Sequence, residues 1–311
     1  MANIFCLTLN PAIDLSLSVD ALRPGSVHRC GPAQSDAAGK GVNVAQALTD
    51  LGHDITVGGF LGAENSASFE RLFAARAWHD VFVRVAGETR INVKVGEASG
   101  RHTDFNTSGF VVSEVDIARL AEQTLALAAA FDAVVVAGSL PRGFAPAALG
   151  KWLAALRARN PRLVLDTSGE ALKEGVGIRP WLIKPNAEEL AELGQTGAAL
   201  HDAGIEHVLV SDGAAGVTWY GPSGVVHATP PPVPVVSTVG AGDTLVAGMV
   251  HALLDARPAT DALRFATACG SYAVTRIGFG LKDVDALAAI ESGVHVTNKT
   301  GNEAGATRGN E

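Results

Sequence analysis

A carboxylate that follows two glycines at the start of a helical stretch is the position of this sequence best placed to do chemistry. Asp243 stands there, in Ser237-Thr-Val-Gly240-Ala-Gly242-Asp243-Thr, at the head of the helical pattern 243–255. The glycines let successive backbone N–H groups converge on an anion at the positive end of the helix. A carboxylate beside them can accept a hydroxyl proton while the amides stabilise charge on a moving phosphoryl group. Aspartate is also a common helix cap, so this segment alone leaves a catalytic base and a cap both open.

A second glycine-rich segment opens a helix much earlier in the chain. It contains Gly39-Lys40-Gly-Val-Asn43, and Asn43 falls in the first turn of the helical stretch 41–51. The segment is not a phosphate-binding P-loop, because no G-x-x-x-x-G-K-[ST] occurs, and the dinucleotide pattern G-x-G-x-x-G is absent as well. Both absences argue against P-loop enzymes and nicotinamide dehydrogenases.

Other polar groups stand where predicted strands end. Ser139 follows one such strand and Asp166 ends another, and strand-to-helix turn chemistry explains them about as well as a ligand does. Lys184-Pro-Asn186-Ala-Glu-Glu189 is equally open, because Asn followed three residues later by Glu is also the pattern of a capping box.

Two cations lie on one face of a predicted strand. Arg90 and Lys94 are four residues apart, so their side chains point the same way and could meet a substrate phosphate. A solvated strand face is the alternative. The formal net charge of the chain is -8, which argues against nucleic acid or an anionic membrane as a partner. A phosphorylated substrate would therefore need cations placed locally.

The elements that must position these residues alternate along the chain. Short β-branched runs alternate with stretches of helical period, which predicts a mostly parallel sheet with helices on both faces and an active site at the carboxyl ends of the strands. Strands are expected near 3–9, 54–60, 133–137, 162–166, 181–184 and 206–211, and helices near 41–51, 113–130, 146–159, 243–255 and 259–276.

Two stretches break this alternation. Polar and apolar residues alternate in 10–30 and 88–108, as in half-exposed strands, so a small separate sheet is expected there. The remaining core would comprise 1–9, 31–87 and 109–292. The polar tail 293–311 lacks periodic apolar residues and is expected to be disordered.

Composition limits the class of protein further. The 311 residues are 47% hydrophobic, enough for one large core. The three cysteines have no C-x-x-C spacing and the nine histidines no H-E-x-x-H spacing, so neither a disulfide framework nor a metal site is indicated. Without a signal peptide or a long apolar run, the protein is expected in the cytoplasm.

Taken together, these segments resemble the ribokinase-like (PfkB) carbohydrate kinases to about residue 290. Order and spacing of several motifs agree, and within that family the likeness is strongest to the bacterial kinases of fructose 1-phosphate. The segments that carry it are Thr8-Leu-Asn-Pro-Ala-Ile-Asp14, Ala37-Ala-Gly-Lys-Gly-Val-Asn43, Gly58-Gly-Phe-Leu-Gly62, Thr89-Arg-Ile-Asn-Val-Lys94, Thr103-Asp-Phe-Asn106 and Gly138-Ser-Leu-Pro141.

The resemblance implies a fold, a reaction and an assembly. The expected fold is a ribokinase-like three-layer αβα sandwich with a mostly parallel central sheet and a small β-sheet lid, and the lids are expected to pair in a homodimer. The expected reaction transfers phosphate from ATP, with Mg²⁺, to D-fructose 1-phosphate. Tagatose 6-phosphate and fructose 6-phosphate remain alternative acceptors, and a requirement for K⁺ is left open.

The resemblance also implies site residues by position. The expected catalytic residues are Asp243, which acts as the base, and Gly240, Ala241 and Gly242 before it. The amides of Ala241, Gly242 and Asp243 are expected to form the anion hole. The residues expected to bind the sugar phosphate are Asp14, Gly39, Lys40, Asn43 and Arg90, with Ser139 assisting. The residues expected to bind the nucleotide are Lys184, Asn186, Ser211, Gly213 and Gly216. Asn186 and Glu189 are expected to bind Mg²⁺ through water.

Two positions depart from the commonest patterns of that family. Ser237 stands where many sugar kinases have Asp or Asn, and Asp212 would repel ATP phosphates unless it turns outward. A sugar-phosphate sensor that kept the fold and lost catalysis is an alternative from another class, although the retained Asp243 argues against it. A nicotinamide oxidoreductase is disfavoured, because Asn10-Pro-Ala-Ile-Asp14 follows the first strand in place of a glycine pattern.

Overall fold

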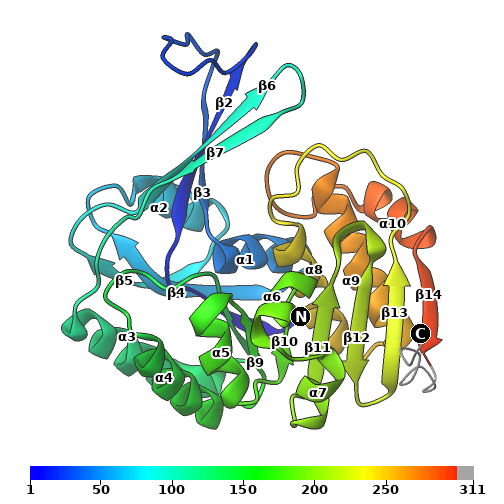
Figure 1. Ribbon diagram of the computed structural model, residues 1–311. Helices are drawn as coiled ribbons and strands as arrows, with labels where there is room; N and C mark the ends of the chain where they lie inside the picture. The colour runs from blue at the N-terminus through cyan, green and yellow to red at the C-terminus, as the bar shows by residue number, and fades with distance from the viewer. Residues whose placement is uncertain (300–311) are drawn as a thin grey trace, which may run out of the picture.

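A ten-stranded sheet forms the centre of the protein (Figure 1). In the computed structural model, which describes residues 1–299, neighbouring strands from β5 to β11 are parallel, and β12, β13 and β14 are added antiparallel. In spatial order the strands are β14 (His295–Lys299), β13 (Gly224–Thr229), β12 (Val217–Gly221), β11 (His207–Ser211), β10 (Leu182–Ile183), β9 (Leu163–Asp166), β8 (Ala133–Ala137), β1 (Asn3–Thr8), β4 (Asp54–Gly62) and β5 (His79–Val85).

The central strands are apolar on both faces because helices cover both faces. In β1, Ile4 and Cys6 belong to one core cluster, whereas Phe5 and Leu7 belong to another on the opposite face. The first cluster includes side chains of α1, α2, α8, α9 and α10, and the second includes side chains of α3, α4 and α5. This is the expected three-layer αβα sandwich, and the fold prediction is confirmed.

The helices begin and end close to the expected positions. The five helices expected from periodicity correspond to α1, α3, α4, α8 and α9, whereas α2, α5, α6, α7 and α10 were not expected. Their bounds are α1 (Lys40–Asp50), α2 (Ala67–Ala75), α3 (Glu114–Leu127), α4 (Pro146–Arg159), α5 (Gly169–Gly177), α6 (Ala187–Leu193), α7 (Gly197–Asp202), α8 (Ala241–Leu254), α9 (Ala259–Val274) and α10 (Val284–Ser292). In residues 1–299 no helix is long and apolar enough to cross a membrane.

A four-stranded sheet, the lid sheet, projects from the core near α1 (Figure 1). Its order is β3 (Gln34–Ala38), β2 (Ala12–Val19), β6 (Arg90–Glu97) and β7 (His102–Asn106), with β2 and β6 parallel. The expected ranges 10–30 and 88–108 enclose β2, β6 and β7. Assigning 31–87 wholly to the core was wrong for β3, because this short polar strand pairs antiparallel with β2.

The end of the described chain also differs from expectation. The range 293–311 was expected to be disordered, but β14 pairs antiparallel with β13 at the edge of the large sheet. A strand at the edge of a sheet needs few apolar residues of its own. The segment His295-Val-Thr-Asn-Lys299 is short and has one apolar residue, so its pattern did not predict a strand. The rest of that range, 300–311, lies outside the described residues.

Candidate active site

The backbone before α8 places Asp243 in the first turn of that helix. Gly240 is the N-cap, with a φ of 80° that favours glycine, and a Cβ there would lie 3.1 Å from the Phe279 ring. Asp243 is the third helical residue, so it is not the cap. Its carboxylate instead accepts a 2.7 Å hydrogen bond from Asn43 Nδ2. The structure therefore removes the capping explanation that the sequence had left open.

Asn43 reaches Asp243 because α1 starts against the carboxyl end of β1. A Cβ on Gly41 would lie 2.6 Å from the Leu7 carbonyl oxygen, so only glycine permits this approach of helix to strand. Asn43 and Asp243 are both buried, at 6% exposure each. A base held by a single short contact in a nearly dry place is suited to taking a proton from a bound hydroxyl.

Asp166 lies at the centre of a cluster of charges beside this base. It is the last residue of β9 and is almost fully buried, at 1% exposure. Its Oδ1 lies 3.2 Å from Lys40 Nζ and 3.4 Å from Lys184 Nζ. Lys184 is itself buried, whereas the Lys40 side chain is about one-third exposed. One carboxylate thus aligns two ammonium groups next to Asp243.

The cluster changes how its members hold protons. Burial raises the pKa of Asp243 to about 6, and the Asp166 carboxylate acts in the same direction. The Asn43 hydrogen bond and the charges of Lys40 and Lys184 oppose this rise. The pKa of Lys40 is raised: burial alone would lower it, but attraction to Asp166 and Asp243 outweighs burial. With a pKa of about 6, the Asp243 carboxylate is largely ionised near neutral pH.

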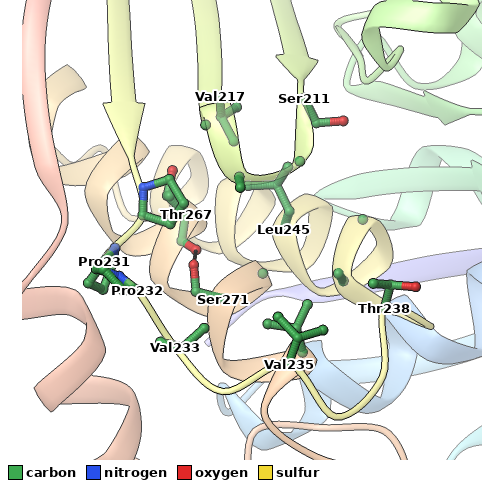
Figure 2. A pocket seen from close by; sticks show the side chains of 18 residues that line it. Ser211, Val217, Pro231, Pro232, Val233, Val235, Thr238, Leu245, Thr267 and Ser271 are labelled. Carbon is green, nitrogen blue, oxygen red and sulfur yellow. Dashed lines mark hydrogen bonds between the residues drawn. The ribbon is translucent and has the colours of Figure 1, made fainter. Parts of the chain in front are cut away.

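The first turn of α8 faces a cavity of about 640 Å³ (Figure 2). Gly242 and Asp243 lie in the first turn of α8, where backbone N–H groups have no acceptor within the helix. The Ala241 amide donates a long hydrogen bond, of 3.4 Å, to the Thr238 carbonyl. Figure 2 shows the cavity between the strands that carry Ser211 and Val217, the loop after β13, and α8 with α9. The cavity is lined by Ser211, Gly213, Ala214, Gly216, Val217, Pro230, Pro231, Pro232, Val233, Val235, Thr238, Ala241, Gly242, Leu245, Thr267, Gly270, Ser271 and Val274.

A second cavity, of about 860 Å³, opens between the lid sheet and the loop that precedes α8. Lys94 lines it from the lid side, and Ser237 and Val239 line it from the loop. Thr238 lines both this cavity and the first one. The two cavities therefore adjoin at the loop that leads into the first turn of α8.

The structure matches known carbohydrate kinases in both sequence and fold. The family model for pfkB family carbohydrate kinases matches residues 1–285. The chain belongs to the pfkB family. It is 43% identical to a 1-phosphofructokinase of Vibrio cholerae over 305 residues, covering 94% of this chain and 96% of that protein. It is also 43% identical to a 1-phosphofructokinase of Escherichia coli strain K12 over 295 residues, covering 91% and 95%.

The fold of this pfkB kinase is also similar to those of solved phosphofructokinase structures. Phosphofructokinase-2 from Escherichia coli in complex with potassium superimposes with a TM-score of 0.86 at 29% identity, covering 94% of this chain and 99% of that one. The same enzyme in complex with fructose-6-phosphate gives 0.84 at 28% identity with the same coverage. The resemblance stated from the sequence motifs is confirmed.

Around the first cavity, the pfkB chain brings together most of the residues that were expected to bind a nucleotide. Ser211, Gly213 and Gly216 line the first cavity, and a β-bridge sets Asn186 beside Ser211. A Cβ on Gly242 would lie 3.4 Å from Lys184 Nζ, so that lysine borders the first turn of α8. The side chain of Asp212 is exposed and does not line the cavity, which removes the expected repulsion of phosphates.

Asn186 and Glu189 form the capping box of α6 that was the alternative to a ligand role. Asn186 Oδ1 accepts from the Glu189 amide at 2.7 Å, and Glu189 Oε2 accepts from the Asn186 amide at 2.8 Å. The box fixes Glu189 but uses only one of its two carboxylate oxygens. Within residues 1–299 no group of three or more His, Cys, Asp or Glu side chains could hold a metal ion by itself.

On the lid side, the structure shows partners that the sequence did not reveal. Lys94 Nζ lies 2.5 Å from Asp14 Oδ2, and Asn92 Nδ2 donates to Asp14 Oδ1 at 3.0 Å. The sequence had left open whether Arg90 and Lys94 both meet a substrate phosphate, and in the structure Lys94 is paired with Asp14. Arg90 instead donates to the backbone carbonyls of the segment that joins β1 to β2.

Two functional candidates were missed as site residues. Asp166 was noticed only as a polar strand end, because its two lysine partners lie 126 positions before it and 18 after it in the chain. Asn10 lies inside the Thr8–Asp14 motif, yet nothing in the sequence connects it to Ser139, which its side chain contacts at 3.1 Å. Both are polar residues at carboxyl ends of parallel strands, and that position is the signal that could have found them.

Proposed function

We propose that this protein is a 1-phosphofructokinase, which transfers the γ-phosphoryl group of ATP to D-fructose 1-phosphate and forms fructose 1,6-bisphosphate and ADP. The similarity to proteins named 1-phosphofructokinase, at 43% identity over more than nine-tenths of the chain, supports the acceptor. One structural observation carries the chemistry: Asp243 is buried in the first turn of α8, directly after Ala241 and Gly242, which line the first cavity, and its carboxylate is held by Asn43.

In the proposed reaction, Asp243 accepts the proton of the acceptor hydroxyl as its oxygen bonds to the γ-phosphorus. The bond from phosphorus to the β–γ bridging oxygen breaks, and ADP leaves with that electron pair. The amides of Ala241, Gly242 and Asp243 receive the charge on the transferred group. Lys40 and Lys184, which are both paired with Asp166 Oδ1, add positive charge beside it. Asp166 keeps both ammonium groups in place during the transfer.

The sugar phosphate is proposed to enter through the cavity under the lid sheet and to bind beside it, at residues of the lid sheet and of α1 that do not line the cavity itself. Asp14 and Asn43 offer hydrogen-bond acceptors and donors to hydroxyl groups, and Lys40, Arg90 and Ser139 offer donors to phosphate. Gly39, with a φ of 136°, brings the backbone close to Thr8 and Pro11 at the mouth of the site. ATP would enter the other cavity, with its phosphates directed to Lys184, to the glycines that follow β11 and to Gly242 at the start of α8.

Mg²⁺ is proposed to arrive with ATP. The second carboxylate oxygen of Glu189 and the side chain of Asn186 can accept hydrogen bonds from water molecules of a hydrated Mg²⁺. Mg²⁺ usually keeps several water ligands, so it needs no complete set of protein ligands. Bound there, the ion would neutralise phosphate charge. K⁺ is a further candidate, since Escherichia coli phosphofructokinase-2 was solved in complex with potassium.

We further propose that the protein forms a homodimer through its lid sheets. Its proposed location is the cytoplasm, where ATP and sugar phosphates are found. Apolar side chains of the lid are left uncovered in one chain: Phe105 on β7 is 53% exposed, and Val27 in the loop after β2 is 89% exposed. A small sheet with exposed apolar groups is stabilised when a second copy covers it.

The deciding experiment measures ADP release with fructose 1-phosphate, fructose 6-phosphate and tagatose 6-phosphate side by side. The proposal expects kcat/KM to be highest for fructose 1-phosphate, by at least about tenfold. A preference for either 6-phosphate would reassign the enzyme to that acceptor. Absence of ADP release with all three sugars would favour a non-catalytic sensor.

A further inference from the structure

Asn10 stands where the chain passes from the core to the lid sheet. It follows Thr8, the last residue of β1, and precedes Ala12, the first residue of β2. Its side-chain Nδ2 donates to Ser139 Oγ at 3.1 Å and to the Leu140 carbonyl at 3.2 Å. The joint of the lid is therefore attached to the turn that follows β8.

The partners of Asn10 fix the direction of its amide group. A backbone carbonyl such as that of Leu140 can only accept, so the NH₂ group and not Oδ1 must face it. Both Nδ2 hydrogens are then used, one on Leu140 and one on Ser139. Because Ser139 Oγ accepts from Asn10, its own hydroxyl hydrogen is directed elsewhere and is available to a ligand.

The backbone of the same joint anchors Arg90. Arg90 Nη2 donates to the Asn10 carbonyl at 3.2 Å, and Nε donates to the Pro11 carbonyl at 3.3 Å. A Cβ on Gly109 would lie 2.9 Å from Arg90 Cβ, so glycine lets the chain pack directly on the arginine stem. A guanidinium carries five N–H donors, so three are left for a ligand after these two bonds.

Asn10 thus contacts two of the groups proposed to bind the substrate phosphate. Its side chain holds Ser139, which belongs to the core, and its carbonyl holds Arg90, which belongs to the lid sheet. Each of these groups retains donors, and a phosphate monoester has three oxygens that accept them. Loss of the Asn10 side chain would free the 10–11 backbone on which Arg90 depends.

We propose that Asn10 is a positioning residue for the sugar phosphate: it fixes the core–lid joint so that Arg90 and Ser139 present their free donors to one phosphate group. This inference rests on the proposed function. Asn10 contacts no reacting atom in this scheme. Its contribution consists in ordering donors before the substrate arrives, which lowers the entropic cost of binding.

The test is a double-mutant cycle with Asn10→Ala, Arg90→Ala and the combined variant, measuring KM for fructose 1-phosphate and for ATP. Asn10→Ala alone is expected to raise KM for the sugar phosphate about fivefold while KM for ATP changes less than about twofold. In the Arg90→Ala background the same substitution should add less than about twofold, because residues that act through one another are not additive. Asn3→Ala, an exposed asparagine at the other end of β1, is the matched control.

Two outcomes would overturn the inference. One is a pair of single effects that simply multiply in the double variant, which would make Asn10 independent of Arg90. The other is an Asn10→Ala variant with unchanged KM for the sugar phosphate. Thermal melts verify folding, and if the alanine variant does not fold, Asn10→Ser, whose hydroxyl has a shorter reach, replaces it in the cycle. Wild-type ADP release tests the proposed function separately, and the cycle is run with whichever sugar phosphate the wild type uses.

Discussion

Asn43 Nδ2 lies 2.7 Å from Asp243 Oδ2, a hydrogen bond that joins the first turns of α1 and α8 across 200 positions of the chain. The bond occupies one carboxylate oxygen and leaves Oδ1 to meet an acceptor hydroxyl. It also favours the ionised form of Asp243, against burial and the Asp166 carboxylate, which both favour the neutral form. The base is thereby oriented and kept usable near neutral pH.

The Asp243→Asn substitution tests this base directly. Asparagine has nearly the same shape but cannot accept the hydroxyl proton, so kcat is expected to fall by about 10² or more while the protein remains folded. Steady-state ADP release gives kcat, and circular dichroism with a thermal melt verifies the fold. Turnover close to wild type would remove Asp243 from the mechanism.

The pH dependence of kcat should report the ionisation of Asp243. With a pKa of about 6, half of the carboxylates are protonated at that pH, so activity is expected to fall as the pH drops below about 6 and to be level above about 7. A profile that stays flat down to pH 5 would contradict the assignment. The control is the melting temperature, which must remain high enough over this pH range to exclude acid unfolding.

Two neighbours of the base should move this acid limb in opposite directions. Asp166 raises the pKa of Asp243 by charge repulsion, so Asp166→Asn is expected to shift the limb to lower pH. Asn43 lowers that pKa by its hydrogen bond, so Asn43→Ala is expected to shift the limb to higher pH. Both variants should also lose turnover. The opposite shifts, measured in profiles of kcat against pH, separate this electrostatic account from a general loss of structure.

The sequence could predict the segments of the site but not their contacts. Asp243, Asn43 and Lys40 were singled out because glycines and a helical period surround them, and both are local signals. Asp166 was not assigned, because its role depends on Lys40 and Lys184, which only the parallel order of the strands brings to one place. The strands β3 and β14 were missed for a related reason: short polar edge strands are specified by their pairing partner more than by their own residues.

The proposed lid dimer predicts that a charge on β7 separates the subunits. Phe105→Asp would place a carboxylate where an apolar contact is expected, so the mass measured by light scattering at micromolar concentration should fall from dimer to monomer. Val284→Asp is the matched control, because Val284 is 73% exposed at the start of α10 and does not belong to the lid sheet. A wild-type protein that is already monomeric at this concentration would contradict the dimer.

Arg90→Ala separates the two substrate sites. Arg90 is half-buried at the joint of the lid sheet, and two of its donors hold the carbonyls of Asn10 and Pro11, so its remaining donors have a fixed direction. An acidic protein that binds a phosphate dianion depends on such anchored cations, and losing a charge-assisted hydrogen bond costs about 1.4 kcal/mol or more, which corresponds to about tenfold in affinity. KM for fructose 1-phosphate is therefore expected to rise at least tenfold, while KM for ATP, which enters the other cavity, changes little. Steady-state kinetics with each substrate varied in turn measures both constants. If KM for ATP rises and that for the sugar phosphate does not, Arg90 serves the nucleotide, and the division of the two cavities between the substrates must be reversed.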